Sequence, residues 1–188
     1  NGIWKRESNR GFELKNKTIG LIGYGNTGKS LAKKLIGLNV NIIFYDIKSI
    51  KKDKYARPVS LNYLKDNSDV ISLHVSMTNE SNGLIDKDFI ESCKKPFWLI
   101  NTSRGDCVIM SDLIEGLKSE KVLGAGLDVI AFEKKSFEKL SVNENDQFSL
   151  DYLNSSSNVI LTPHIAGWTH ESKMGLVKIA LKKIKKLL

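Results

Sequence analysis

The chain has 188 residues, enough for one domain with a hydrophobic core and too few for two domains of ordinary size. Hydrophobic residues make up 41% and charged residues 27%, a composition that is typical of globular proteins and excludes an intrinsically disordered chain. No apolar run approaches the ~20 residues that cross a bilayer, and the N-terminus has no apolar core of the signal-peptide type. We therefore expect a cytoplasmic protein with no membrane partner.

The net charge is +8, from 29 Lys and Arg against 21 Asp and Glu, and such a balance attracts phosphates, nucleic acids or acidic substrates. The lysines are dispersed, however, and the one dense cluster, at 182–186, is interpreted as a solvated helix face. No nucleic-acid motif accompanies it, so we expect no nucleic-acid partner. The cysteines, Cys93 and Cys107, are interpreted as reduced thiols, and neither they nor the three histidines have metal-ligand spacing.

Apolar runs of strand length alternate along the chain with segments of helical periodicity. Strands are predicted at 17–22, 40–45, 70–75, 97–101, 122–129 and 158–161. Helices are predicted at 27–37, 61–66, 86–93, 111–119 and from 169 to the end, with Ser111 as the N-cap of the fourth. Because strands that are apolar on both faces belong to parallel sheets covered on both sides, the pattern predicts a doubly wound α/β fold of the Rossmann type.

Two stretches stand outside this alternation. Residues 1–16 are polar and form an N-terminal lead-in, and residues 17–188 form the predicted dinucleotide-binding domain. Within that domain, residues 134–157 are interpreted as a long polar connection. A connection of this length is usually functional, flexible or in contact with a partner.

The segment Gly23-Tyr24-Gly25-Asn26-Thr27-Gly28 matches the pattern G-x-G-x-x-G, directly after a predicted strand and at the start of a predicted helix. The first glycine permits a tight turn, the second lets a pyrophosphate approach the backbone, and the third lets helix and strand pack closely. The helix that follows offers unpaired N–H groups to the phosphates. This context favours a dinucleotide site.

Asp46 ends the second predicted strand, 18 residues after Gly28. A carboxylate at this place accepts hydrogen bonds from the ribose hydroxyls of the adenosine and repels a 2′-phosphate, which favours NAD over NADP. Lys48 is close enough to soften this preference. The expected cofactor is NAD.

Three later segments follow the last three predicted strands or close them. They are Asn101-Thr102-Ser103-Arg104-Gly105, then Gly126-Leu127-Asp128-Val129 with Glu133 beyond it, and Thr162-Pro163-His164-Ile165-Ala166-Gly167. In a doubly wound sheet all three lie at the carboxyl edge, where ligands bind.

With these motifs in this order, the chain resembles the nucleotide-binding domain of the D-isomer-specific 2-hydroxyacid dehydrogenases. That family includes D-lactate, D-glycerate, D-3-phosphoglycerate and formate dehydrogenases. The stretch Ser68–Val75, with Thr78 and Gly83-Leu84-Ile85 after it, is also similar to the family. The resemblance extends roughly from Gly11 to the final helix.

The resemblance implies a catalytic role for Arg104, Glu133 and His164. Arg104 would bind the substrate carboxylate and polarise the carbonyl oxygen, which suits a guanidinium that is always charged and offers two parallel donors. His164 would be the acid/base, because imidazole exchanges protons near physiological pH. Glu133 would hold the far ring nitrogen of His164 and stabilise the imidazolium.

The resemblance also implies cofactor contacts along the sheet edge. Asn26 and Thr27 would face the pyrophosphate, Thr78 the phosphate or ribose region, and Asp128 the nicotinamide carboxamide. His74 is expected to line the cofactor side without carrying chemistry. The residues expected to contact NAD are Gly23, Gly25, Asn26, Thr27, Gly28, Asp46, His74, Val75, Thr78, Thr102, Ser103, Arg104, Asp128, His164 and Gly167.

The sequence departs from the family at Ser76 and Lys134, where proline is common; this changes loop stiffness but removes no reacting group. Members of the family also carry a second, substrate-binding domain, which we expect to be missing from this chain, so that the chain is a fragment inactive alone. A homodimer is expected, with residues 1–12 and 134–157 as its contacts.

The implied activity is hydride transfer between NAD(H) and a D-2-hydroxy acid or 2-oxo acid. D-3-phosphoglycerate is compatible with the basic charge balance. An alternative from a different class is a non-catalytic NAD-sensing dimer module, as in the corepressors related to this family. A nucleic-acid-binding protein would rest on the net charge alone.

Overall fold

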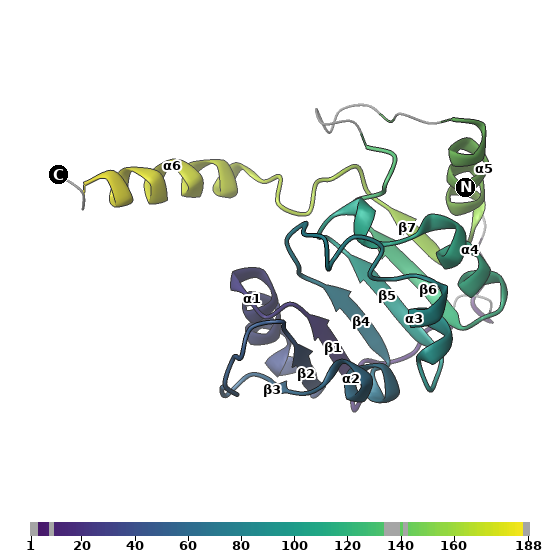
Figure 1. Ribbon diagram of the computed structural model, residues 1–188, viewed down its shortest axis with the longest axis horizontal. Helices are drawn as coiled ribbons and strands as arrows, with labels where there is room; N and C mark the ends of the chain where they lie inside the picture. Colours follow the sequence, from purple (N-terminus) through teal and green to yellow (C-terminus); the bar gives the residue numbers. More distant parts are fainter. Residues whose placement is uncertain (1–3, 8–9, 134–139, 141–142, 186–188) are drawn as a thin grey trace.

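The computed structural model describes residues 4–7, 10–133, 140 and 143–185. Its centre is a parallel sheet with the strand order β3-β2-β1-β4-β5-β6-β7, as Figure 1 shows. The strands are β1 (Thr18–Ile22), β2 (Asn41–Tyr45), β3 (Arg57–Pro58), β4 (Val70–Leu73), β5 (Phe97–Asn101), β6 (Val122–Leu127) and β7 (Val159–Leu161). The predicted doubly wound fold is confirmed. The order reverses direction between β1 and β4, which is the place where such sheets bind ligands.

Helices connect the strands and follow the last one. They are α1 (Asn26–Leu35), α2 (Leu61–Asn67), α3 (Lys87–Ser92), α4 (Met110–Lys118), α5 (Glu144–Ser155) and α6 (His170–Ile184), with short 3-10 helices η2 (Ile36–Leu38) and η3 (Gly105–Cys107). Polar caps fix several starts: Ser60 accepts the N–H of Tyr63 at α2, and Asp86 accepts the N–H of Phe89 at α3.

The predicted start of α4 is wrong. Ser111 lies inside the helix, whose N-cap is Ile109 without a side-chain cap, and the hydroxyl of Ser111 donates to Asp112 instead. Met110 is buried, and its packing against the core draws it into the first turn. Packing of an apolar side chain has outweighed the capping preference of serine.

The prediction for residues 134–157 is also wrong in part. The second half of this stretch is α5, which begins with a capping box in which Asn143 and Asp146 accept each other's backbone N–H groups. Leu153 anchors the helix, because its side chain is 1% exposed. The rest of the stretch, 134–139 and 141–142, lies outside the described residues.

Two hydrophobic clusters lie on opposite faces of the sheet. The larger one joins α2, α3, α4 and α5 to the strands, for example through Leu64, Leu113 and Leu153. The smaller one joins α1 to β1 and β2 through Ala32 and Phe44. The helices of the described chain thus cover one face fully but the other chiefly at β1 and β2.

The expectation that both faces are covered therefore holds only for part of the sheet. Ile160 of β7 is 70% exposed on the face that α1 leaves open, and Phe12 of the lead-in packs against Trp98 of β5 with ring centroids 5.6 Å apart.

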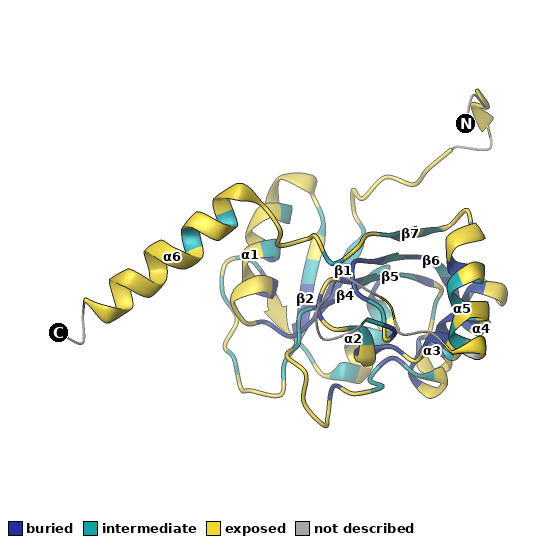
Figure 2. Ribbon diagram, turned by 90° about the horizontal axis from the view of Figure 1, so that it is seen from above, coloured by how far each residue is buried: buried dark blue, intermediate teal, exposed yellow. Residues whose placement is uncertain are grey.

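The last helix, α6, leads away from the sheet and buries none of its residues (Figures 1 and 2). Its apolar side chains, among them Leu176 and Ile179, are more than half exposed. No helix in the described chain is long and apolar enough to cross a membrane.

Candidate functional site

The glycine turn between β1 and α1 is built for close backbone approach. Gly23 has a φ of +92°, and a Cβ there would lie 2.5 Å from the carbonyl oxygen of His74. A Cβ on Gly28 would overlap the carbonyl oxygen of Gly23. Gly25 differs, because no described atom beyond its two chain neighbours lies within 4 Å of the position that a Cβ would take there. The turn is therefore tight on its protein side and open on its outer side.

The start of α1 lies at this opening. Gly25 is its N-cap, and no described side chain caps the helix. Asn26 and Thr27 are exposed, so the first backbone N–H groups point towards an accessible surface. Uncapped N–H groups at a helix start bind phosphate, and the space at Gly25 admits one. These residues fit the pyrophosphate of a dinucleotide.

Asp46, at the end of β2, lies beside the same turn. One carboxylate oxygen accepts the N–H of Tyr24 at 2.7 Å, and the other accepts the N–H of Lys48 at 2.8 Å. The acidic residue expected at the adenosine ribose is thus attached directly to the glycine turn.

His74 and Val75 follow β4, on the other side of the turn. Burial lowers the pKa of His74 to about 4, and its Nε2 lies 2.9 Å from the hydroxyl of Ser72. The ring is therefore neutral at physiological pH, which agrees with a lining role rather than proton transfer. The carbonyl oxygen of Val75 accepts the hydroxyl of Ser103, which joins this segment to the loop after β5.

The loop after β5 carries Arg104. Asn101 shapes the loop, because its side chain accepts the N–H of Ser103 and donates to the carbonyl oxygen of Arg104. The Arg104 guanidinium is exposed and donates to the carbonyl oxygen of Ser103 at 2.6 Å. A Cβ on Gly105 would overlap the carbonyl group of Ile130, so this loop lies directly against the segment that leads to Glu133.

His164 and Glu133 form a pair. The Nδ1 of His164 lies 2.7 Å from one carboxylate oxygen of Glu133, and the other oxygen accepts the N–H of Ile130 at 3.1 Å. Both side chains are partly buried, with 26% and 15% of their surfaces exposed. A carboxylate held in this way fixes the tautomer and orientation of an imidazole.

Asp128 holds the loop that carries His164. Its carboxylate accepts the hydroxyl of Thr162 at 2.6 Å and the N–H groups of Ile165 and Ala166 at 2.8 and 2.9 Å, and its carbonyl oxygen accepts the N–H of His164. Sequence reasoning did not predict that Asp128 holds this loop, since it expected Asp128 to contact the nicotinamide carboxamide alone.

The sequence-predicted residues thus gather along one edge of the sheet, at the carboxyl ends of β1, β2, β4, β5, β6 and β7 (Figure 1). Thr78 lies in the loop after β4, where its N–H donates to the buried hydroxyl of Ser81. Thr102 and Gly167 are exposed in their loops. Two buried residues hold these loops from inside, Ser81 and Asn101. Sequence reasoning missed Ser81, and it included Asn101 in a motif without assigning it a role.

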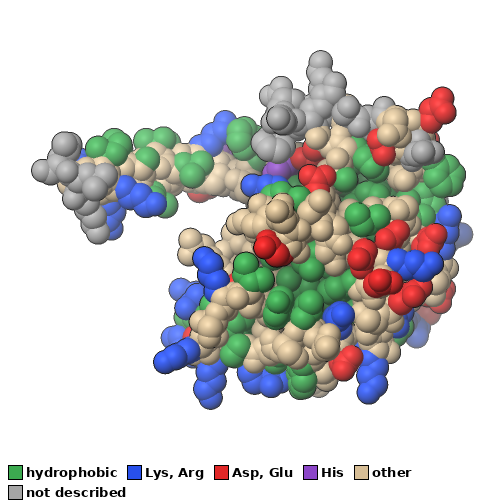
Figure 3. All heavy atoms as spheres, in the orientation of Figure 1, with side chains coloured by type: hydrophobic (Ala, Val, Ile, Leu, Met, Phe, Trp, Pro, Cys, Tyr) green, Lys and Arg blue, Asp and Glu red, His purple; other side chains and the backbone are tan. Residues whose placement is uncertain are grey.

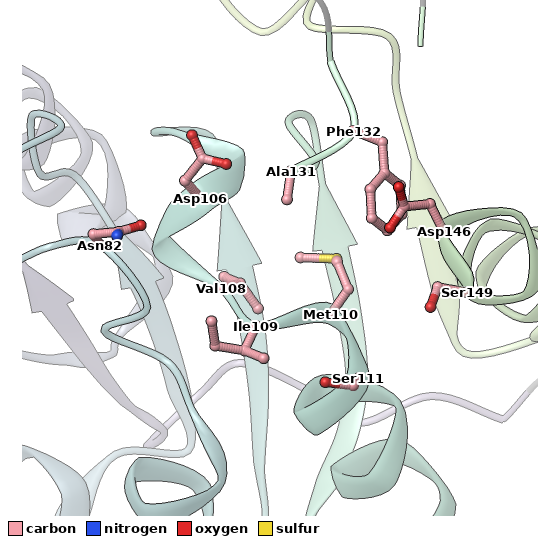
Figure 4. A pocket seen from close by; sticks show the side chains of 10 residues that line it. All are labelled: Asn82, Asp106, Val108, Ile109, Met110, Ser111, Ala131, Phe132, Asp146 and Ser149. Atoms are coloured by element: carbon pink, nitrogen blue, oxygen red, sulfur yellow. The ribbon is translucent and has the colours of Figure 1, made fainter. Parts of the chain in front are cut away.

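A separate cavity of about 330 Å³ lies beside η3 and between the start of α4 and α5 (Figure 4). Val108, Met110 and Phe132 give it an apolar lining, and Asp106 and Asp146 add carboxylates. It contains none of the predicted site residues.

The site combines a glycine turn that opens a helix with an acidic residue at the end of β2 and a histidine–carboxylate pair at the same edge. This combination is typical of a dinucleotide-binding domain. The family model described as "D-isomer specific 2-hydroxyacid dehydrogenase, NAD binding domain" matches residues 1–166. The chain belongs to this family, and its cofactor is NAD. The resemblance stated from the sequence is confirmed.

Similar proteins are about twice as long or more. D-3-phosphoglycerate dehydrogenase 1 of Saccharomyces cerevisiae is 35% identical over 176 residues, covering 93% of this chain and 38% of that protein. Glyoxylate reductase of Thermofilum pendens is 35% identical over 191 residues, covering 97% of this chain and 53% of that protein. The crystal structure of D-lactate dehydrogenase with NAD+ from Lactobacillus jensenii matches with a TM-score of 0.83 and 30% identity, over 95% of this chain and 55% of that one.

Proposed function

We propose that this domain serves an oxidoreductase that transfers a hydride between NAD(H) and a D-2-hydroxy acid or 2-oxo acid. The observation that carries the proposal is the His164–Glu133 pair, 2.7 Å apart, at the same sheet edge as the glycine turn. An acid/base histidine with a carboxylate behind it is the group that an alcohol–ketone interconversion requires.

Each side chain has a distinct role in this reaction. Arg104 binds the substrate carboxylate and polarises the carbonyl oxygen. Glu133 occupies Nδ1 of His164, so Nε2 takes the hydroxyl proton during oxidation and returns it during reduction. NAD, when bound, supplies the hydride acceptor. The positive charge that His164 gains is stabilised by Glu133.

The cofactor contacts are proposed from the same geometry. Gly23, Gly25, Asn26, Thr27 and Gly28 cradle the pyrophosphate, because the turn is open there and the helix start is uncapped. Asp46 takes the adenosine ribose. The remaining contacts line the edge towards the nicotinamide: His74, Val75, Thr78, Thr102, Ser103, Arg104, Asp128, His164 and Gly167.

The substrate class follows from what the relatives' names share. They are reductases of glyoxylate, hydroxypyruvate and aromatic 2-oxoacids and dehydrogenases of D-3-phosphoglycerate, all acting on 2-oxo or 2-hydroxy acids. Arg104 suits the carboxylate common to them. Among these substrates we put D-3-phosphoglycerate first, since the net charge of +8 favours an acid that carries a phosphate as well as a carboxylate.

Turnover by the natural full-length protein tests this function. We expect NADH oxidation with a panel of 2-oxo acids, and a fall in kcat of about a hundredfold or more in Glu133→Gln, with a much smaller change in the Kd for NADH. Binding of NADH without turnover of any 2-oxo acid would instead favour the NAD-sensing module of the corepressor type. Glu120→Gln, at an exposed turn, is the matched control.

We further propose a cytoplasmic homodimer, with 1–12 and 134–157 as its contacts. Two observations support the dimer: Trp4 and Phe12 are 101% and 77% exposed, and the cavity beside α5 offers an apolar surface. The buried free thiols Cys93 and Cys107 suit a reducing compartment. Light scattering that gives a strictly monomeric mass, for the wild type and Trp4→Ala alike, would contradict the dimer.

A further inference from the structure

Tyr24, the residue between the first two glycines of the turn, is buried rather than exposed to the ligand. Its ring is 3% exposed and stacks on Phe44 of β2, with centroids 3.8 Å apart and planes 8° from parallel. Its backbone N–H donates to Asp46, and its hydroxyl donates to Asp53 at 3.0 Å. One residue thus joins the glycine turn to the end of β2 and to the loop that follows it.

Asp53 is the centre of that loop. Besides the Tyr24 hydroxyl, its carboxylate accepts the N–H groups of Tyr55 and Ala56 at 2.8 and 3.2 Å, and it pairs with Lys29 of α1 at 3.0 Å. Burial raises the pKa of this carboxyl, but the hydrogen bonds from Tyr55, Lys29 and Tyr24 outweigh burial and bring the pKa down to about 2. Asp53 is therefore ionised throughout the physiological range.

These contacts fix Asp46 from both sides. The loop from 47 to 56 begins at Asp46, whose second oxygen accepts the N–H of Lys48 within that loop. Asp53 attaches the far end of the loop to α1 and to Tyr24. Asp46 therefore cannot turn away without losing its hydrogen bonds from the N–H groups of Tyr24 and Lys48, the first of which is partly buried.

The lysines around the site make a fixed Asp46 necessary if the domain is to bind NADH in preference to NADPH. Lys33, Lys34, Lys48, Lys51 and Lys52 are exposed on α1 and on the loop after β2, and Figure 3 shows basic side chains gathered at this end of the molecule. Such a field attracts any additional phosphate, including the 2′-phosphate of NADP. Discrimination then depends on an opposing carboxylate that stays at the ribose.

We propose that Tyr24, Asp53 and Lys29 form a clasp that holds Asp46 at the ribose, and that this clasp sets the preference of the domain for NADH over NADPH. Asp53 is a positioning residue in this arrangement, since it acts through Tyr24 and the loop. The inference rests on the proposed role of Asp46 at the adenosine ribose.

The test is calorimetric titration of the 188-residue chain with NADH and with NADPH, for the wild type, Asp53→Asn and Tyr24→Phe. We expect the ratio of the NADPH to the NADH dissociation constant to fall about fivefold or more in Asp53→Asn. Asp53→Asn also removes a negative charge, which by itself favours NADPH. Tyr24→Phe changes no charge, so a fall of about threefold in the same ratio in that variant would be due to the lost positioning of Asp46.

Asp66→Asn, on an exposed carboxylate of α2, is the charge-matched control and should leave the ratio unchanged. An unchanged ratio in both clasp variants while the wild type prefers NADH would overturn the clasp and leave the cofactor site standing. Should Asp53→Asn fail to fold, the ratio in Tyr24→Phe decides alone. A wild type that binds neither nucleotide overturns the site itself, and the clasp with it.

Discussion

His164 adopts a backbone φ of +54°, in the left-handed region that non-glycine residues seldom enter. Such a conformation persists where the surroundings over-determine it. Here Asp128 binds the residues on both sides of His164, and Glu133 binds its ring. The proposed acid/base group is thus preorganised by its own domain, which would reduce the reorganisation that the proposed reaction needs.

Gly25 gives the most direct residue-scale test of the phosphate cradle. Because a methyl group there meets no described atom, Gly25→Ala should leave the thermal midpoint nearly unchanged while occupying the approach of the pyrophosphate. We expect the affinity for NADH to fall about tenfold or more. Calorimetry and thermal unfolding measure the two effects on one sample.

Gly28→Ala is the contrasting variant, since its methyl would overlap the carbonyl oxygen of Gly23 and should destabilise the fold itself. If Gly25→Ala bound NADH like the wild type, the pyrophosphate would not lie at this turn.

His74 predicts a pH dependence of stability. Its pKa is lowered by burial from 6.5 to about 4, so protons bind the unfolded chain more readily than the folded one in this window. The stability that the neutral His74 ring contributes to the free energy of unfolding is fully present above pH 6.5. It is lost as the pH falls towards 4, at roughly 1.4 kcal/mol per pH unit at most. Urea unfolding at several pH values should show this slope in the wild type.

The variant His74→Asn should lack that part of the slope. The lowered pKa of Asp53 affects the free energy of unfolding only below pH 4, so its pH range does not overlap with that of His74. Identical slopes for the variant and the wild type between pH 6.5 and 4 would contradict a neutral, half-buried His74.

Among the elements, the long apolar strands were predictable and the irregular ones were not. Predicted strands at 17–22 and 97–101 match β1 and β5 within one residue, because continuous apolar runs mark buried parallel strands. β3 has only two residues and contains Pro58, which leaves no periodic signal. α5 escaped prediction because its polar sequence buries little besides Leu153.

The candidate site likewise contains residues that were predictable from the sequence and residues that were not. Arg104, Glu133 and His164 lie in motifs that mark them in the sequence. Asp53 has no such mark, since its bond to Tyr24 joins residues 29 apart and depends on how β2 packs against α1. The residues proposed to contact ligands or react were therefore predictable, whereas those proposed to position them required the fold.

The start of α5 offers a prediction at the element scale. Asn143→Ala removes the side chain of the capping box and should lower the free energy of unfolding by about 1 kcal/mol. Asn154→Ala, at an exposed site in the same helix, is the control and should change it by a few tenths at most. Equal effects in denaturant unfolding would show that the cap contributes nothing.

At the scale of the molecule, two apolar surfaces are covered by no helix of the described chain: the face of the sheet at β5 to β7, where Phe12 packs on Trp98, and the side chains of α6. Charge is also uneven, with basic side chains around α1, β2 and β3 and acidic ones around α3 and α4 (Figure 3). The chain spans 38% to 53% of the length of the curated relatives named above. The residues proposed to bind the nucleotide, by contrast, all lie in the described part of this chain.

Titration of this chain with NADH and NADPH in a calorimeter tests the central claim most directly, because every residue proposed to hold the cofactor is present. We predict one NADH site per chain and binding of NADPH weaker by about tenfold or more, since Asp46 opposes the 2′-phosphate. Absence of NADH binding, or equal affinity for the two nucleotides, would contradict it.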